Sequence, residues 1–453
     1  MRHRSPLALA ALAAAGLIVA GCSAASPSTA DESGERTITV AYQKTSAFHQ
    51  LDDLFKKVKP EFEAANPGVT VNLQPIESED EYFTKLALMN GSPDTAPDVI
   101  YEDTFQIRSD AAAGYLLPID DYVNNWADWD QFYDAAKQAG LGDDGKTYGV
   151  SMGTDTRGIY YNKTLFAAAG LPTDWQPESW DDILDAARKI KASNPDVIPI
   201  NIYGSKAAGE QASMQGIEML LYGTDSTLYD TDAQKWVTGS AGLKDTFGFY
   251  KDLYSESLAT PLDLALDPTI GSRVSTELIP QGKLAMAIDG SWLPGGWIEG
   301  DHAWPEWQQT MGLAKMPTQD GGDPGFTSMS GGWTLAVGSQ SKHPKTSFDF
   351  IAMALNQENS LKYDTENSQI AVRDDVATSD EYLSYNPTFK FFSDLVQYTH
   401  FRPATPDYSQ ISSSLQQAAE SVITGDKTPE QAASDYDADV TKIVGASGTK
   451  QGD

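Results

Sequence analysis

The alternation of strand and helix patterns after the first 36 residues is the feature that most constrains the fold of this chain. In residues 37–42 and 69–73, β-branched and apolar side chains alternate with polar ones, which is typical of strands. Between them, apolar side chains recur every three or four residues from Leu51 to Phe62, which predicts a helix. A strand, a helix and a second strand form the repeating unit of a parallel sheet. The sequence therefore predicts an α/β fold.

The N-terminal segment predicts export from the cytoplasm. Arg2 and Arg4 precede an apolar stretch that is shorter than the roughly 20 residues of a transmembrane helix. The stretch ends in Val-Ala-Gly-Cys at residues 19–22, which resembles a bacterial lipobox. By that resemblance, residues 1–21 are a lipoprotein signal peptide, and Cys22 carries the lipid that anchors the protein to the extracellular face of the cytoplasmic membrane. The alternative is an ordinary signal peptide followed by a chance cysteine.

Composition limits the partners and the source of stability. Residues 22–36 are mostly small, polar or acidic, which predicts a flexible tether. Cys22 is the only cysteine, so a hydrophobic core rather than disulfides must stabilise the fold, and 453 residues are enough for two domains. The net charge of −32 repels phosphate groups, so we expect no nucleic-acid partner.

Four later segments carry a family resemblance. They are GIYYNK at 158–163 with ESWDD at 178–182, GKLAMAIDGSW at 282–292, GGWTLAV at 331–337, and RP at 402–403 with PDY at 406–408. In order and spacing they resemble the extracellular solute-binding proteins of carbohydrate ABC importers, the family of maltose-binding protein. The resemblance covers residues 37–445.

This resemblance implies a two-lobed, periplasmic-binding-protein-like α/β fold with a ligand cleft between the lobes. The expected crossing segments lie near 148–154, 289–292 and 332–334. The expected lobes are an N-terminal one of residues 37–149 plus 293–333 and a C-terminal one of residues 150–292 plus 334–453. The implied function is capture of a sugar, a di- or oligosaccharide, by hinge closure and its delivery to the transmembrane permease subunits of an ABC importer. We expect a monomer, anchored in a cell without an outer membrane, hence a Gram-positive source.

Tryptophans at the expected crossings are the first candidates for ligand contact. Trp292 follows a Gly-Ser pair, and Trp333 follows Gly332. An aromatic ring can stack on the apolar face of a sugar, and a neighbouring glycine lets the backbone approach the ligand. The alternative is that either ring belongs to the core.

Polar candidates lie near the same positions. Asp155 follows the first expected crossing, where a carboxylate can accept hydrogen bonds from two sugar hydroxyls, or it is a turn residue paired with Arg157. Glu102 and Asp103 follow the strand predicted at 98–101, and we expect one of them to reach the cleft. Gln43 follows the first predicted strand and is a candidate by the same reasoning.

Two arginines and one tyrosine complete the candidate site. The guanidinium of Arg373 or Arg402 could bind two neighbouring hydroxyls or hold a carboxylate that binds the sugar. In a chain this acidic, either could instead form a structural ion pair. Tyr203 follows the strand predicted at 198–202 and could contact the ligand at its edge.

A lipid-anchored extracellular glycoside hydrolase is the alternative function, because 64 acidic residues leave room for a catalytic carboxyl pair. A surface adhesin is a third class, which would need no closable cleft. The sequence contains no G-x-S-x-G elbow and no nucleotide-binding loop, and its histidines have no metal-ligand spacing. We therefore expect no catalytic residues, no metal and no cofactor, with nucleotide binding left to a separate subunit.

Overall fold

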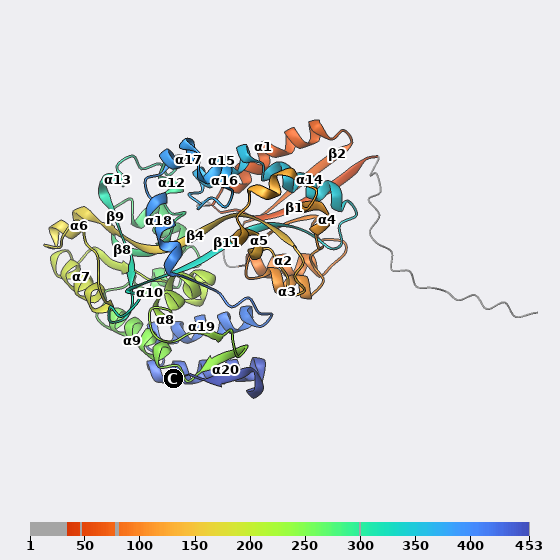
Figure 1. The fold of residues 1–453 in the computed structure, drawn as a ribbon. Helices are drawn as coiled ribbons and strands as arrows, with labels where there is room; N and C mark the ends of the chain where they lie inside the picture. The colour runs from red at the N-terminus through yellow and green to blue at the C-terminus, as the bar shows by residue number, and fades with distance from the viewer. Residues whose placement is uncertain (1–33, 46–47, 78–80, 299, 453) are drawn as a thin grey trace, which may run out of the picture. The chain divides into compact units, whose positions relative to one another are not determined.

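The computed structural model describes residues 34–45, 48–77, 81–298 and 300–452, which fold around a ten-stranded mixed sheet (Figure 1). The predicted signal peptide and Cys22 lie outside the described residues, as does most of the predicted tether. The main path of the sheet runs β2-β1-β3-β11-β4-β8-β5. Its strands are β1 (Arg36–Gln43), β2 (Val69–Ile76), β3 (Val99–Asp103), β4 (Gly149–Asn162), β5 (Ile198–Asn201), β8 (Leu284–Gly290) and β11 (Phe326–Val337), with β9 (Met311–Ala314), β10 (Met316–Pro317) and β12 (Thr399–Phe401) attached at the side.

The first part of the sheet has the predicted strand-helix-strand order. Strand β1 pairs in parallel with β2 and with β3, and α1 (Gln50–Ala65) connects β1 to β2. The apolar positions of α1 are buried, and Phe55 packs edge-on against Tyr42 of β1 with ring centroids 4.9 Å apart. The prediction of an α/β fold is confirmed.

Two long strands, β4 and β11, connect the two halves of the structure. The first half is built around β1, β2 and β3, and the second half around β5 and β8. Near its end, β11 pairs with β3 through residues 333–337, while β4 pairs with β8 through residues 157–161. The two strands also pair with each other in antiparallel register, with Gly332 opposite Thr154. In Figure 1 they run from one half of the ribbon to the other. The crossings expected near 148–154 and 332–334 therefore lie on β4 and β11.

The remaining crossing lies elsewhere than predicted. After β8 the chain does not leave its own half, because Leu293 and Trp297 pack in one core with Tyr160 of β4. The chain crosses later, near residues 370–373, where Ile370 forms an isolated bridge with Thr154. The expectation of a crossing at 289–292 was wrong, because the turn after β8 keeps the chain in the core to which β8 itself belongs.

Core packing also differs from the expected lobe boundaries at two segments. After β8, the residues Leu293, Trp297, Trp307 and Met311 pack with the second half, held there by pairing of β9 with β4. Residues 335–337 and 348–355 pack with the first half, beside β1 and β3. Both segments thus lie opposite to the lobes predicted for them, while the residue at which each lobe ends stays a prediction.

Helices cover both halves. The first core contacts α1, α2 (Tyr82–Asn90), α3 (Ile107–Ala112), α4 (Asp120–Val123), α5 (Asp134–Ala139), α14 (Pro344–Ala354) and α15 (Gln357–Glu366). The other helices are α6 (Lys163–Ala168), α7 (Trp180–Ser193), α8 (Met219–Leu221), α9 (Ala241–Ser255), α10 (Leu262–Ala265), α11 (Ile270–Arg273), α12 (Gly295–Ile298), α13 (Trp307–Thr310), α16 (Asp374–Ala377), α17 (Asp380–Tyr385), α18 (Phe389–Leu395), α19 (Tyr408–Ile423) and α20 (Pro429–Val444). Near the C-terminus, β13 (Thr449–Gln451), β7 (Lys235–Thr238) and β6 (Tyr229–Asp230) form a small second sheet.

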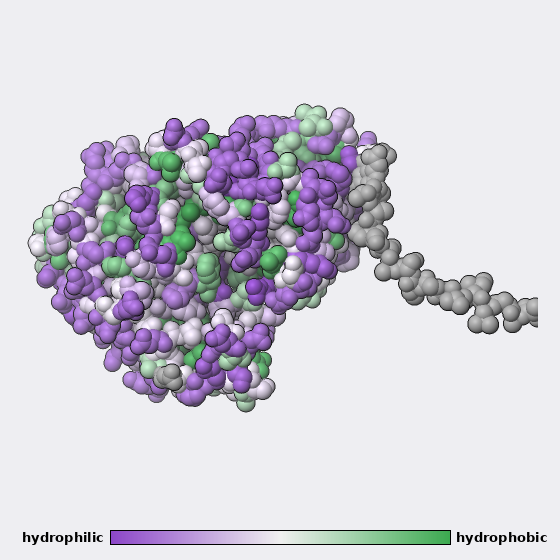
Figure 2. All heavy atoms as spheres, viewed as in Figure 1, coloured by the Kyte–Doolittle hydropathy of each residue, from purple (hydrophilic) through white to green (hydrophobic). Residues whose placement is uncertain are grey.

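The surface is largely polar on the face shown in Figure 2. Small hydrophobic patches lie there between the polar side chains. Within the described residues, no helix combines the length and the apolar composition needed to cross a bilayer.

Candidate ligand-binding cleft

A cleft with a cavity volume of about 180 Å³ opens where residues of both halves meet. The first half contributes the ends of β1 and β3, and the second half contributes β4 and the loop before the π-helical turn η3 (Ala212–Glu218). Seven of the ten predicted ligand-binding residues line it: Gln43, Asp103, Asp155, Trp292, Gly332, Trp333 and Arg402. The crossing strands thus bring together residues that are far apart in the sequence.

Trp333 lies on a platform of aromatic rings. Its ring stacks on Tyr101 with centroids 4.2 Å apart and planes 5° apart, and it is also nearly parallel to Phe83. Gly332, directly before it, has φ +150, and a Cβ there would lie 2.7 Å from the carbonyl oxygen of Gly153. Only glycine fits this close approach of β11 to β4. The glycine therefore fixes the position at which Trp333 enters the cleft.

Trp292 is held between a glycine and an arginine. The guanidinium carbon of Arg157 lies 4.7 Å from the centroid of the Trp292 ring, a cation–π contact. A Cβ on Gly290 would lie 2.0 Å from the Cζ3 atom of Trp292, so the ring rests against this backbone. Trp292 therefore also positions Arg157, a role that the sequence did not indicate.

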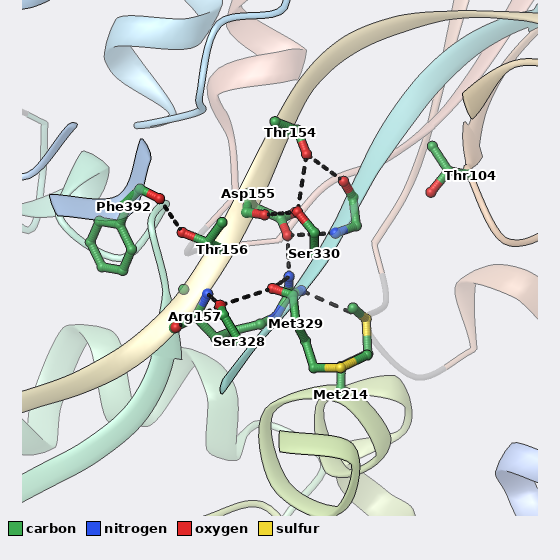
Figure 3. Close-up of polar contacts among 12 residues, drawn as sticks. Thr104, Thr154, Asp155, Thr156, Arg157, Met214, Ser328, Met329, Ser330 and Phe392 are labelled. Carbon is green, nitrogen blue, oxygen red and sulfur yellow. Dashed lines mark hydrogen bonds and ion pairs between the residues drawn. The ribbon is translucent and has the colours of Figure 1, made fainter. Parts of the chain in front are cut away.

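Asp155 and Arg157 form a buried ion pair on β4. Figure 3 shows the pair between β4 and β11, with the arginine extending towards Met214. Asp155 Oδ1 also accepts the backbone N–H of Gly331 at 2.9 Å, and Arg157 Nη1 donates to the carbonyl of Met329 at 3.2 Å. The two alternatives for Asp155 are thus compatible, because the residue is paired with Arg157 and still lines the cleft.

Arg402 joins carboxylates from the two halves. Its Nη2 donates to Asp103 of β3 at 2.5 Å, and its Nη1 donates to Glu210 at 3.2 Å. The ring of Phe105 lies 4.2 Å from the guanidinium carbon. Glu210 in turn accepts hydrogen bonds from Tyr408 and Ser412. Arg402 therefore forms the ion pairs weighed as its structural alternative and also lines the cleft, while its contact with a ligand stays a prediction.

Burial raises the pKa of two acidic residues in or near this cluster, Asp103 and Glu218. It raises the pKa of Asp103 to about 6, although the nearby Arg402 charge acts in the opposite direction. It raises the pKa of Glu218 to about 7, against the effect of a hydrogen bond from Tyr408. Asp103 therefore binds a proton at a higher pH than an exposed aspartate does.

The other three predicted residues lie outside this cleft. Glu102 alternates with Asp103 along β3 and is fully buried; burial, reinforced by the charge of Asp110, raises its pKa well above the usual value. Tyr203 donates to Asp289 at 3.1 Å in an adjoining cavity of about 30 Å³ that shares Trp292 with the cleft. Arg373 is buried and bound to Asp128 and Asp375, which is the structural ion pair considered as its alternative.

A second group of lining residues was not predicted from the sequence. They are Phe48, Gln50, Leu51, Phe83, Tyr101, Arg157, Ala207, Ala208, Gly209, Glu210, Gln211, Met214, Gln215, Pro268, Tyr363, Asn367 and Gln369. Residues 207–215 carry no recognisable sequence motif, and their position beside the cleft depends on the π-helical turn η3. Tyr363 and Gln369 lie close to the crossing near Ile370, and they could have been predicted only if that crossing had been recognised in the sequence. Among the described residues, no group of three or more His, Cys, Asp or Glu side chains could hold a metal ion.

Comparison with known proteins agrees with this arrangement. Residues 48–360 match the family model of the bacterial extracellular solute-binding proteins. A binding protein of Brucella abortus is 26% identical over 431 residues, covering 94% of this chain and 97% of that protein. The multiple sugar-binding protein of Streptococcus mutans is 23% identical over 366 residues, covering 79% and 80%.

A solved structure shows the same fold. The ABC transporter solute-binding protein of Thermotoga lettingae, bound with α-D-tagatose, superposes with a TM-score of 0.78 and 25% identity, covering 90% of this chain and all of that one. The predicted two-lobed fold is confirmed. Since the family model spans well over half of the sequence, this chain belongs to the bacterial extracellular solute-binding proteins.

Proposed function

We propose that this protein is a lipid-anchored receptor that binds a sugar, a di- or oligosaccharide, and delivers it to the permease of an ABC importer. The observation that carries the proposal is the combination of half-buried tryptophan rings and oriented carboxylates in one cleft. Sugars offer apolar C–H faces to aromatic rings and hydroxyl donors to carboxylate oxygens. Trp333 and Asp155 supply one group of each kind. The protein acts by binding and not by catalysis.

The named relatives support a sugar as the ligand. The Streptococcus mutans relative is named a multiple sugar-binding protein, and a Bacillus subtilis relative is named an arabinooligosaccharide-binding protein. The Thermotoga lettingae structure contains bound α-D-tagatose. Both tryptophans line the cleft, but Arg157 covers one face of the Trp292 ring, so Trp333 is the main stacking surface that we propose for the sugar.

Binding is coupled to closure of the halves. The cleft is lined from both sides, so a ligand makes its full set of contacts only when both sides approach it. Such a ligand shifts the population towards the closed form. The permease then recognises the closed, loaded receptor.

A thermal-shift screen tests the proposed ligand class. We expect one class among mono-, di- and trisaccharides to raise the melting temperature of the Cys22→Ser protein and to be recovered intact. A ligand at 100 times its Kd stabilises the native state by about 2.7 kcal/mol, which is readily measured. Cleavage of the stabilising sugar would instead establish the hydrolase. If no sugar stabilises the protein, the solute is of another class.

Membrane anchoring has its own test. In a Gram-positive host, we expect the wild-type protein to stay with the membrane fraction and the Cys22→Ser variant to appear in the medium, because only the first has a thiol to lipidate. Ser23→Ala is the matched control and should remain with the membrane. Equal retention of both variants would show that Cys22 is not the anchor.

A further inference from the structure

The charged side chains of the cleft are already paired with one another. Asp103, Asp155 and Glu210 face Arg157 and Arg402, and in the described part of the chain no lysine or histidine lines this cleft. The lining thus holds one more acid than base. A negatively charged ligand would meet this excess in a partly desolvated site, where like charges repel strongly.

Arg157 presents no accessible pair of donors to an anion. Its Nη1 donates to Asp155 and to the carbonyl of Met329, and its Nη2 faces the sulfur of Met214 at 3.7 Å. Its Nε is buried and has no partner among the described residues. The Trp292 ring covers the guanidinium. The Nε–Nη2 edge thus keeps unpaired donors, but Nε is sealed from solvent and the side chain is only 5% exposed, so an anion in the cleft does not reach this edge.

The terminal nitrogens of Arg402 also donate hydrogen bonds to the protein itself. One terminal nitrogen donates to Asp103 and the other to Glu210, while Phe105 covers a face of the group. The side chain is only 4% exposed. Binding an anion here would require breaking a buried ion pair, which is strongly unfavourable.

The carboxylates, in contrast, keep acceptor capacity. Asp103 and Asp155 use Oδ1 for their hydrogen bonds. Their Oδ2 atoms accept none from the described residues and are not sealed from solvent. The cleft therefore presents spare acceptors, which call for a ligand that donates hydrogen bonds through hydroxyl or ammonium groups.

We infer that the cleft selects its ligand by charge, admitting uncharged or amino-substituted sugars and polyols and excluding phosphorylated and carboxylated ones. The inference rests on the proposed receptor function and narrows its ligand class. Asp103 and Asp155 determine the selectivity, because they neutralise the only guanidinium groups among the described residues that line the cleft.

The test uses sn-glycerol 3-phosphate and glucose 6-phosphate at constant ionic strength, with binding followed by melting temperature and calorimetry. The wild-type protein should show no stabilisation by either. Asp103→Asn and Asp155→Asn each release part of an arginine, so each should bind these phosphates at least about tenfold more tightly than wild type. Asp394→Asn, an exposed residue paired with Lys390, makes the same charge change outside the cleft and should bind no better than wild type.

The outcomes separate this inference from the receptor function. Tight binding of either phosphate by the wild-type protein would overturn charge selection while leaving a solute receptor. Failure of both asparagine variants to gain phosphate binding, with cooperative melting retained, would overturn the role of the carboxylates. If one variant does not fold, the other still decides, because the two residues lie on different strands and contact different arginines.

Discussion

Replacing Arg402 with methionine is expected to lower the free energy of unfolding by about 3–5 kcal/mol at pH 8. The change leaves Asp103, with its side chain 7% exposed, without its cation and removes a donor from Glu210. A buried carboxylate that has lost its partner carries the full desolvation penalty. Methionine fills much of the vacated volume, so the expected loss reflects charge rather than a cavity.

The loss of unfolding free energy in Arg402→Met should become smaller as the pH falls. Burial already raises the pKa of Asp103 to about 6 in the wild-type protein, and removing Arg402 removes an effect that lowers it. A carboxyl whose folded pKa lies above its unfolded value destabilises the fold as the pH rises through the folded pKa. At pH 5 the variant can protonate Asp103, and its deficit relative to wild type should be smaller than at pH 8.

Urea unfolding at pH 5, 6.5 and 8 measures this effect. Arg188→Met is the matched control, since Arg188 also pairs with two acids, Glu256 and Asp185, but lies on the surface. Exposed ion pairs contribute about 0–1 kcal/mol. A loss at Arg402 no larger than at Arg188, or one independent of pH, would contradict the buried arrangement.

Trp333→Ala is expected to weaken binding of the stabilising sugar by about 10- to 100-fold, as stacking and the burial of an aromatic ring predict. The variant also uncovers Tyr101, on which the indole now stacks, so stability should fall as well. Trp333→Phe keeps a ring and should recover part of the affinity. Calorimetric titration and thermal unfolding together separate these two effects.

Trp129→Ala is the control for this substitution. Trp129 is half-buried in the first half, where it packs against Trp126 and Lys137, and it does not line the cleft. Its removal should lower stability without changing the Kd of the sugar. Unchanged affinity in Trp333→Ala would remove Trp333 from the ligand-binding surface.

The sequence predicted those parts of the site that are set by local pattern and family motif. Trp333 follows a Gly-Gly pair on a β-branched and apolar strand, and Asp103 ends a buried strand, so both could be placed at the cleft. Arg373 could not be distinguished from Arg402, because nothing near it indicates that Asp128, 245 residues away, will bind it. Contacts over such separations depend on how the halves pack.

The crossing near Ile370 was missed for a related reason. Its pairing with Thr154 is an isolated bridge rather than a strand, so no alternating pattern marks it. The turn after β8 contains Gly and Trp in the positions expected of a crossing, yet the burial of Trp297 keeps the chain in its own half. Burial of side chains in the tertiary fold, and not the local sequence pattern, therefore determines that the chain crosses near Ile370 and not at residues 289–292.

The ladder between β4 and β11 shifts register between Trp333 and Thr334, where Met152 of β4 is left without an opposite residue. A bulge of this kind bends the strand, increases its local twist and can re-aim a side chain beside a binding site. Here the irregularity lies directly after an aromatic residue that lines the cleft. The break in the ladder between β4 and β11 therefore also sets the direction in which the Trp333 ring faces the cleft.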